Sequence, residues 1–266
     1  MNITIPDFFY FNKRKKIIIT ASILTIGLLS TQLVSFNLRF KSITVLAIIT
    51  CILSIWSLWE GINRMKAVVL IILPVFFTVA VSSFYFLLPI RWLTRLPVAF
   101  GFGLLFYLLL LSQNVFNVAA IRTIPLYRAA STANFLFTLL SAFFIFNVLY
   151  SLNLLFLWNG IIVTVISFLL VVQVLWSIEM GDKISAAILI QSIVLSVGLG
   201  ELGLVFSFWP VQPTIWALSL SSAVYVSVGL TTQFLREKGS GRVMLEYMAI
   251  GLVALLVSFF STSWIG

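Results

Sequence analysis

Residues 112–134 read SQNVFNVAAIRTIPLYRAASTAN, and this stretch gathers amide side chains, two arginines and a proline into one short segment. Apolar runs of roughly bilayer length lie on both sides of it, at residues 98–121 and 130–150. A membrane-spanning helix needs about 20 apolar residues. The stretch therefore predicts the polar end of a helical hairpin that crosses a bilayer twice and folds about Pro125.

The composition of the whole chain is typical of a membrane protein. Of its 266 residues, 62% are apolar and 9% are charged, and the mean hydropathy is +1.18. Such a chain dissolves in a bilayer and precipitates from water. Further apolar runs lie at residues 17–36, 42–59, 67–88, 155–176, 184–208, 214–235 and 243–263. The expected fold is all-α, a polytopic transmembrane helical bundle of about nine spans, with eight as the alternative.

A basic tail precedes the first apolar run. Residues 1–16 end in Lys13, Arg14, Lys15 and Lys16, and we expect this tail to be cytoplasmic and to contact anionic headgroups. The following run is about a full span long and no A-x-A site follows it, so a retained anchor is favoured over a cleaved signal peptide. Residues 17–266 are expected to form a single transmembrane helical domain.

The distribution of basic residues predicts the orientation. Twelve of the 16 lysines and arginines fall on the side of the amino terminus in this layout, and the other four are Arg39, Lys41, Arg91 and Arg95. Because cytoplasmic loops carry an excess of Lys and Arg, the amino terminus is predicted on the cytoplasmic side and, with nine spans, the carboxyl terminus outside. Residues 89–97, PIRWLTRLP, fit this pattern poorly. They are an outer loop, an interfacial segment or the sign of a miscounted span.

Four amides near the end of the hairpin form a candidate polar clasp: Gln113, Asn114, Asn117 and Asn134. If the hairpin folds about Pro125, Asn117 and Asn134 lie at nearly the same depth and can hydrogen-bond each other. Such a bond contributes only about 0.6 to 2 kcal/mol within a membrane, but an unpaired amide in hydrocarbon costs more. A structural clasp is the favoured interpretation.

The arginines of the same hairpin, Arg122 and Arg128, are candidate contacts for an anion or a lipid headgroup. A guanidinium group binds phosphate in a bidentate manner, and anionic lipids are abundant at the cytoplasmic surface. Membrane topology alone also places basic residues there. Both interpretations are open, and the expected partners are membrane lipids, including anionic phospholipid.

Glu201 is the one acid well inside a predicted span, in the sequence VGLGELGLVF. It lies roughly 12 Å from the level of Trp209 at a rise of about 1.5 Å per residue. Ionisable groups inside membranes are candidates for function and are commonly paired or exposed to water. Glu201 is therefore either a coupling group that gains and loses a proton or the partner of a cation such as Arg39, Arg91 or Arg95.

The same run carries a stripe of small residues at spacings of three and four: Ser192, Ser196, Gly200, Gly203 and Ser207. At about 100° per residue they share one narrow face, which is typical of close helix contact in membranes. We call this set the small-residue stripe. Its neighbour is a helix of the same chain, a second copy in a homo-oligomer, or a partner membrane subunit.

The sequence argues against several classes of function. It has no histidine and a lone cysteine, Cys51, so common metal sites are disfavoured and no metal or cofactor is expected. It lacks the DDxxD motif that holds magnesium on a prenyl diphosphate. The cations lie at the ends of apolar runs, which argues against nucleic acid. Catalysis is disfavoured, and no catalytic residue is assigned.

The segment NVFNVAAIRTIPLYRAASTANFLFTLLSAFF, residues 114–144, resembles a group of uncharacterised multi-pass membrane proteins from small-genome bacteria. The resemblance implies a bacterial plasma-membrane protein and no activity.

Three functions remain in consideration. The first is a non-catalytic scaffold or envelope-assembly subunit, packed through its amides and small residues. The second is a small-solute transporter or channel with Glu201 as coupling group and Pro74 as a hinge. The third is a lipid-modifying enzyme of unrecognised type.

Overall fold

The computed structural model describes residues 12–31, 34, 38–59, 64–88, 91–118, 124–181, 183–236 and 240–262. Over these ranges the chain forms nine α-helices and no strand. In chain order they are α1 (Lys13–Thr31), α2 (Arg39–Leu58), α3 (Arg64–Tyr85), α4 (Trp92–Val118), α5 (Ile124–Ser151), α6 (Phe156–Glu179), α7 (Ala186–Phe206), α8 (Pro213–Leu235) and α9 (Gly241–Phe260).

The predicted helical membrane fold is confirmed. In the described part of the chain, eight helices, α2 to α9, are long and apolar enough to cross a membrane. Helix α1 is the exception because four basic residues occupy its first turn. It nevertheless packs into the bundle through Ile17, Ala21, Leu24 and Leu28, which are buried in the main hydrophobic core.

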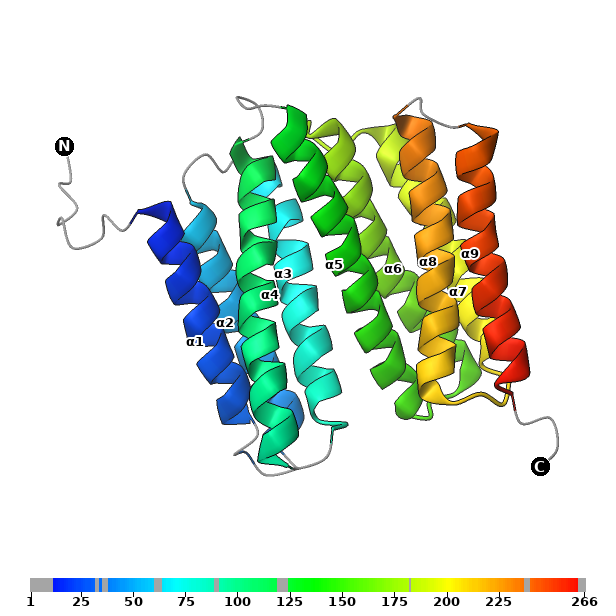
Figure 1. Cartoon of the computed structure of the whole chain (residues 1–266), viewed down its shortest axis with the longest axis horizontal. Coiled ribbons are helices and arrows are strands. Elements are labelled where there is room, and N and C mark those ends of the chain that lie inside the picture. The colour runs from blue at the N-terminus through cyan, green and yellow to red at the C-terminus, as the bar shows by residue number, and fades with distance from the viewer. Residues whose placement is uncertain are drawn as a thin grey trace.

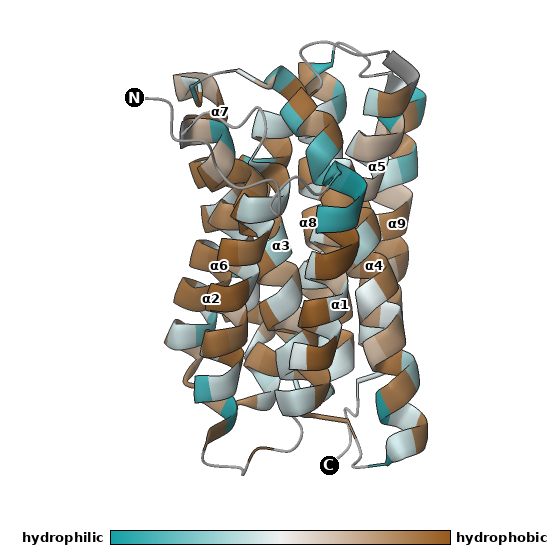
Figure 2. Ribbon diagram, turned by 90° about the vertical axis from the view of Figure 1, so that its left-hand side faces the viewer, coloured by the Kyte–Doolittle hydropathy of each residue, from teal (hydrophilic) through white to brown (hydrophobic). Residues whose placement is uncertain are grey.

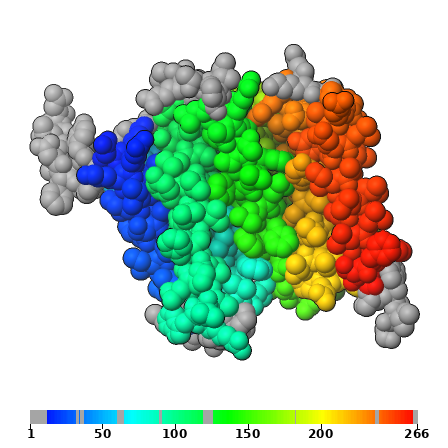
Figure 3. All heavy atoms as spheres, in the orientation of Figure 1, coloured from blue at the N-terminus to red at the C-terminus, as the bar shows by residue number. Residues whose placement is uncertain are grey.

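Helix α5 lies at the centre of the bundle. It packs against α3 and α4 on one side and against α6 and α8 on the other, so it joins the amino-terminal helices to the carboxyl-terminal ones (Figure 1). The space-filling view shows α4, α5, α8 and α9 side by side across one face of the molecule (Figure 3). The one extensive contact of helix α9 within the described chain is with α8, and most of the surface of α9 is exposed.

The ends of the bundle differ in charge. We call the end at which α1, α3, α5, α7 and α9 begin the basic face, since Lys13, Arg14, Lys66, Arg128 and Arg242 lie there. The described cations at the opposite end are Arg39, Lys41, Arg91 and Arg95. Hydrophobic residues dominate the middle of the helices, and hydrophilic ones gather towards their ends (Figure 2).

Two helices begin earlier than the apolar pattern indicates. Helix α4 starts at Trp92, so residues 92–97 are its first turns, and Arg95 is buried there with its carbonyl oxygen accepting a 3.1 Å hydrogen bond from Tyr85 Oη. Residues 92–97 are therefore helical and continuous with the rest of α4, so they are not a plain loop. Residues 89–90 lie outside the described ranges.

Helix α5 starts at Ile124, which places Pro125 in its first turn. A proline fits there because the first amides of a helix have no partner within the helix. The hairpin therefore does not fold about Pro125. Its connection lies before α5, in residues outside the described ranges.

Candidate functional site

Three amide side chains meet in the core of the bundle, one from each of α4, α5 and α6. Asn134 Oδ1 accepts hydrogen bonds of 2.8 Å from Gln113 Nε2 and of 2.8 Å from Gln173 Nε2. Asn134 Nδ2 in turn donates to Gln173 Oε1 at 3.4 Å. All three side chains are fully buried. We call Gln113, Asn134 and Gln173 the amide cluster.

The pairing within this cluster differs from the one the sequence suggested. Asn117 does not meet Asn134. Its Nδ2 donates to the carbonyl oxygen of Leu58 at 2.8 Å, and so binds one of the carbonyls left open at the end of α2. Because α5 begins at Ile124, it extends beyond the end of α4 (Figure 1). Asn134 consequently lies opposite Gln113, about one helical turn deeper in the bundle than Asn117.

Sequence reasoning missed Gln173. It stands in an apolar run, LLVVQVLW, and the signal that could have found it is its isolation as the one amide of that run's inner half. Asn114 belongs to α4 but stays outside the cluster. Its Oδ1 is buried and has no hydrogen-bond partner among the described residues.

The arginines of the hairpin are not brought into this cluster. Arg128 is exposed in the second turn of α5, and its carbonyl oxygen accepts a 3.1 Å hydrogen bond from Thr132 Oγ1. Arg122 lies outside the described residues. The contact of these two arginines with a lipid headgroup therefore stays a prediction.

The small-residue stripe of α7 faces α6 of the same chain. A Cβ on Gly200 would stand 2.9 Å from the Gly160 carbonyl oxygen, and one on Gly203 would stand 3.0 Å from the Val163 side chain. Ser207 Oγ accepts a hydrogen bond from Asn159 Nδ2 at 3.0 Å. Ser192 and Ser196 are buried as well. The two helices consequently form the most extensive helix contact in the bundle.

Glu201 lies on a different side of α7, which faces away from the bundle. It is exposed, has no ion pair with another described residue, and does not line any of the cavities described below. The surrounding surface is apolar and exposed at Ile190, Val194, Val197 and Val205. We call this surface, with Glu201 in it, the outer face of α7.

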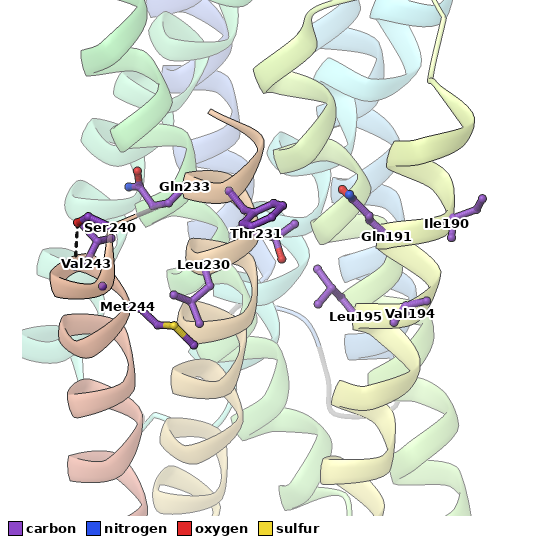
Figure 4. Close-up of a pocket in the computed structure, with 12 residues that line it drawn as sticks. Ile190, Gln191, Val194, Leu195, Leu230, Thr231, Gln233, Ser240, Val243 and Met244 are labelled. Carbon is purple, nitrogen blue, oxygen red and sulfur yellow. Dashed lines mark hydrogen bonds between the residues drawn. The ribbon is translucent and has the colours of Figure 1, made fainter. Parts of the chain in front are cut away.

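A cavity of about 590 Å³ adjoins this face between α7, α8 and α9 (Figure 4). Ile190, Val194, Leu230 and Met244 give it a mainly apolar lining. Figure 4 shows Gln191 extending from α7 towards α8 at its edge. Because Ile190 and Val194 belong to both surfaces, the cavity continues the outer face of α7 as a groove.

The chemistry available in these arrangements is that of recognition and packing. The amide cluster is neutral and contains no nucleophile. No group of three or more His, Cys, Asp or Glu side chains suited to a metal ion occurs in the part of the chain that the structure describes. The amides join helices, and the carboxyl group of Glu201 lies on the outward side of α7.

Fold and contacts together define a multi-pass α-helical membrane protein. The chain belongs to the family described as "Protein of unknown function (DUF5656)", whose model matches residues 43–261. The match begins within α2 and continues to the end of α9. Comparison with curated proteins and with solved structures gave no match. The family description agrees with the resemblance to uncharacterised proteins and assigns no activity.

Proposed function

We propose that the protein is a non-catalytic scaffold subunit of a bacterial plasma membrane, and that it holds a transmembrane helix of a partner subunit against α7. The observation that carries this proposal is the exposure of Glu201 in the middle of the apolar outer face of α7.

The free-energy cost of an unpaired carboxyl group in hydrocarbon indicates that Glu201 has a partner outside this chain's described residues. A charged or unpaired polar group in hydrocarbon is costly, so such groups face a partner or water. No described residue pairs with Glu201. A lysine or arginine on a neighbouring transmembrane helix would supply the missing charge, and the apolar residues around Glu201 would pack against the same helix.

The shape of the surface supports the same occupant. Gly198 lies one turn from Glu201, and a Cβ built on it meets nothing within 4 Å. Towards the basic face, the groove between α7, α8 and α9 widens this surface. Small residues and grooves allow helix backbones to approach closely in membranes. A single helix laid along α7 would cover Ile190, Val194, Val197 and Glu201 together.

The other two functions receive less support. A small-solute transporter that uses Glu201 as its coupling group needs that carboxyl in a water-filled path, whereas its position on the outer face favours contact with another chain. A lipid-modifying enzyme needs acids, bases or nucleophiles in a fixed array, and the amide cluster supplies none.

Site-specific photo-crosslinking in native membranes tests the proposal. A photo-reactive residue at Val197 should form a covalent adduct with one membrane protein, and the same residue at Leu104, exposed on α4, serves as the matched control. The adduct should disappear in the Glu201→Leu variant. A Glu201→Lys variant should lose it too, and replacing the facing basic residue of the captured helix by Glu should restore it.

Three results would overturn the proposal. These are adducts with lipid alone at Val197, an adduct that persists in the Glu201→Leu variant, and an adduct with a second copy of this chain. The thermal unfolding of each Glu201 variant in detergent should match that of the original protein, because the Glu201 side chain is exposed and has no hydrogen bond or ion pair with another described residue.

A further inference from the structure

Another cavity, of about 310 Å³, is lined by residues of α5, α6, α8 and α9. Its polar lining consists mainly of hydroxyl-bearing side chains and one arginine, namely Ser131, Thr132, Ser177, Thr232, Tyr247 and Arg236. We call it the Arg236 pocket. Its position near the ends of α6 and α8 places it at the basic face.

Among the described residues that line this pocket, Arg236 is the charged one. It follows α8 directly, and its Nη2 donates a 2.5 Å hydrogen bond to Ser131 Oγ. Its guanidinium carbon lies 5.8 Å from the centre of the Tyr127 ring, a distance at which the cation is attracted to the ring face. Two side chains of α5, Ser131 and Tyr127, therefore hold the guanidinium in place.

Part of the hydrogen-bonding capacity of the pocket is unused. Arg236 Nε and Thr232 Oγ1 are both buried and have no partner among the described residues. Ser131 Oγ accepts the bond from Arg236, which leaves its own hydrogen available. Buried donors without partners cost free energy, and a bound acceptor would remove that cost.

No carboxylate in the described ranges competes for Arg236. The acids on the nearest elements, Glu179 on α6 and Glu246 on α9, are both exposed, and neither lines the pocket. The carbonyl oxygens at the end of α6 would repel an anion. Tyr127 Oη, however, donates to the Ser177 carbonyl at 3.0 Å and occupies it.

The deeper half of the pocket is aromatic. The Phe135 and Tyr225 rings lie 5.7 Å apart, and the Tyr225 and Tyr247 rings 4.9 Å apart. Gly229 makes this possible, because a Cβ at that position would collide with the Tyr247 ring. The pocket thus offers an end with a cation and aliphatic hydroxyl groups, and an end lined by aromatic rings.

We infer that the Arg236 pocket binds a phosphate group, with Arg236, Ser131 and Thr232 donating hydrogen bonds to its oxygens. Guanidinium and hydroxyl donors in partly buried sites suit phosphate, and charge-assisted bonds of this kind are the strong ones. The phosphate belongs either to the headgroup of an anionic lipid or to a water-soluble phosphate compound. The inference is independent of the proposed helix contact at Glu201, because the described lining of the Arg236 pocket includes no residue of α7.

Two measurements on the full-length protein separate these sources. Native mass spectrometry from nanodiscs of mixed phosphatidylglycerol and phosphatidylcholine should show retained phosphatidylglycerol if the source is a lipid. Thermal unfolding in detergent, with inorganic phosphate against chloride at equal ionic strength, should show stabilisation if the source is soluble. In whichever measurement binding occurs, Arg236→Gln should weaken it about 10-fold or more.

Arg242→Gln, an exposed basic residue at the same face, is the matched control and should leave binding unchanged. Thr232→Val keeps the side-chain volume and should weaken binding about 3- to 10-fold, so the inference remains testable if Arg236→Gln unfolds the protein. Binding that is absent from both measurements would overturn it, as would binding that is insensitive to both substitutions. Lipid retention that depends on Arg128 and not on Arg236 would also overturn it.

Discussion

Gly200 on α7 faces Gly160 on α6 at such close range that a Cβ on residue 200 would stand 2.9 Å from the Gly160 carbonyl oxygen. Thr164 closes the same space from the side, with its Oγ1 within collision distance of that Cβ. Close backbone approach of this kind maximises van der Waals contact between membrane helices, where the hydrophobic effect gives no driving force for association. The close approach of α6 and α7 therefore depends on the absence of a side chain at residue 200, as it does at Gly160 and Gly203.

Gly200→Ala should destabilise the protein by about 1 to 3 kcal/mol, because the added methyl group must push α6 and α7 apart. Gly198→Ala is the matched control. It lies in the same helix, and a Cβ there meets nothing within 4 Å, so that variant should be neutral or slightly more stable. The measurement is unfolding by titration with a denaturing detergent. Equal effects of the two substitutions would show that the contact is not tight.

Asn134→Leu should destabilise the protein by about 1 to 3 kcal/mol, since it leaves the buried donors of Gln113 and Gln173 without their acceptor. A variant with leucine at all three positions should be less destabilised, because no unpaired polar group then remains in the core. The same detergent titration compares both. If the triple variant is the least stable of the set, the hydrogen bonds of the amide cluster stabilise the fold more than apolar side chains at the same positions would.

The orientation of the bundle can be tested with introduced thiols in a Cys51→Ser background. Leu154→Cys lies in the turn between α5 and α6, and Lys183→Cys lies at the basic face between α6 and α7. With the amino terminus in the cytoplasm, a membrane-impermeant reagent added to intact cells should modify the thiol at position 154 and spare the one at 183 until the cells are permeabilised. The reverse labelling pattern would show that the amino terminus lies outside the cell.

The sequence was sufficient for the helical membrane class, because an unbroken apolar run of about 20 residues has few alternatives to a helix in a bilayer. It was less informative about where helices begin. Trp92 and Ile124 start α4 and α5 with turns that contain arginine or proline, residues that lower the local hydropathy without ending a helix. Because the start of α5 was placed too late, Asn117 was expected to pair with Asn134, whereas the structure pairs Gln113 with it.

Helix neighbours were beyond reach of the sequence for a different reason. Hydrophobic periodicity identifies a face but does not say which other helix covers it. The small-residue stripe predicted a close contact, yet α6 as its neighbour could be named only once the helices were placed. Gln173 could not be assigned from sequence for the same reason, because its hydrogen-bond partner, Asn134, lies on a different helix.

The central position of α5 has a consequence for biosynthesis. A chain that leaves the ribosome from its amino terminus inserts α4 while Gln113 still lacks the oxygen that it will bind, and Asn134 arrives only with the next helix. Gln173 follows one helix later and completes the set. The order of translation is therefore also the order in which these amides find partners. A chain that stops after α4 would leave the Gln113 amide without its acceptor in the membrane, where an unpaired polar group is costly.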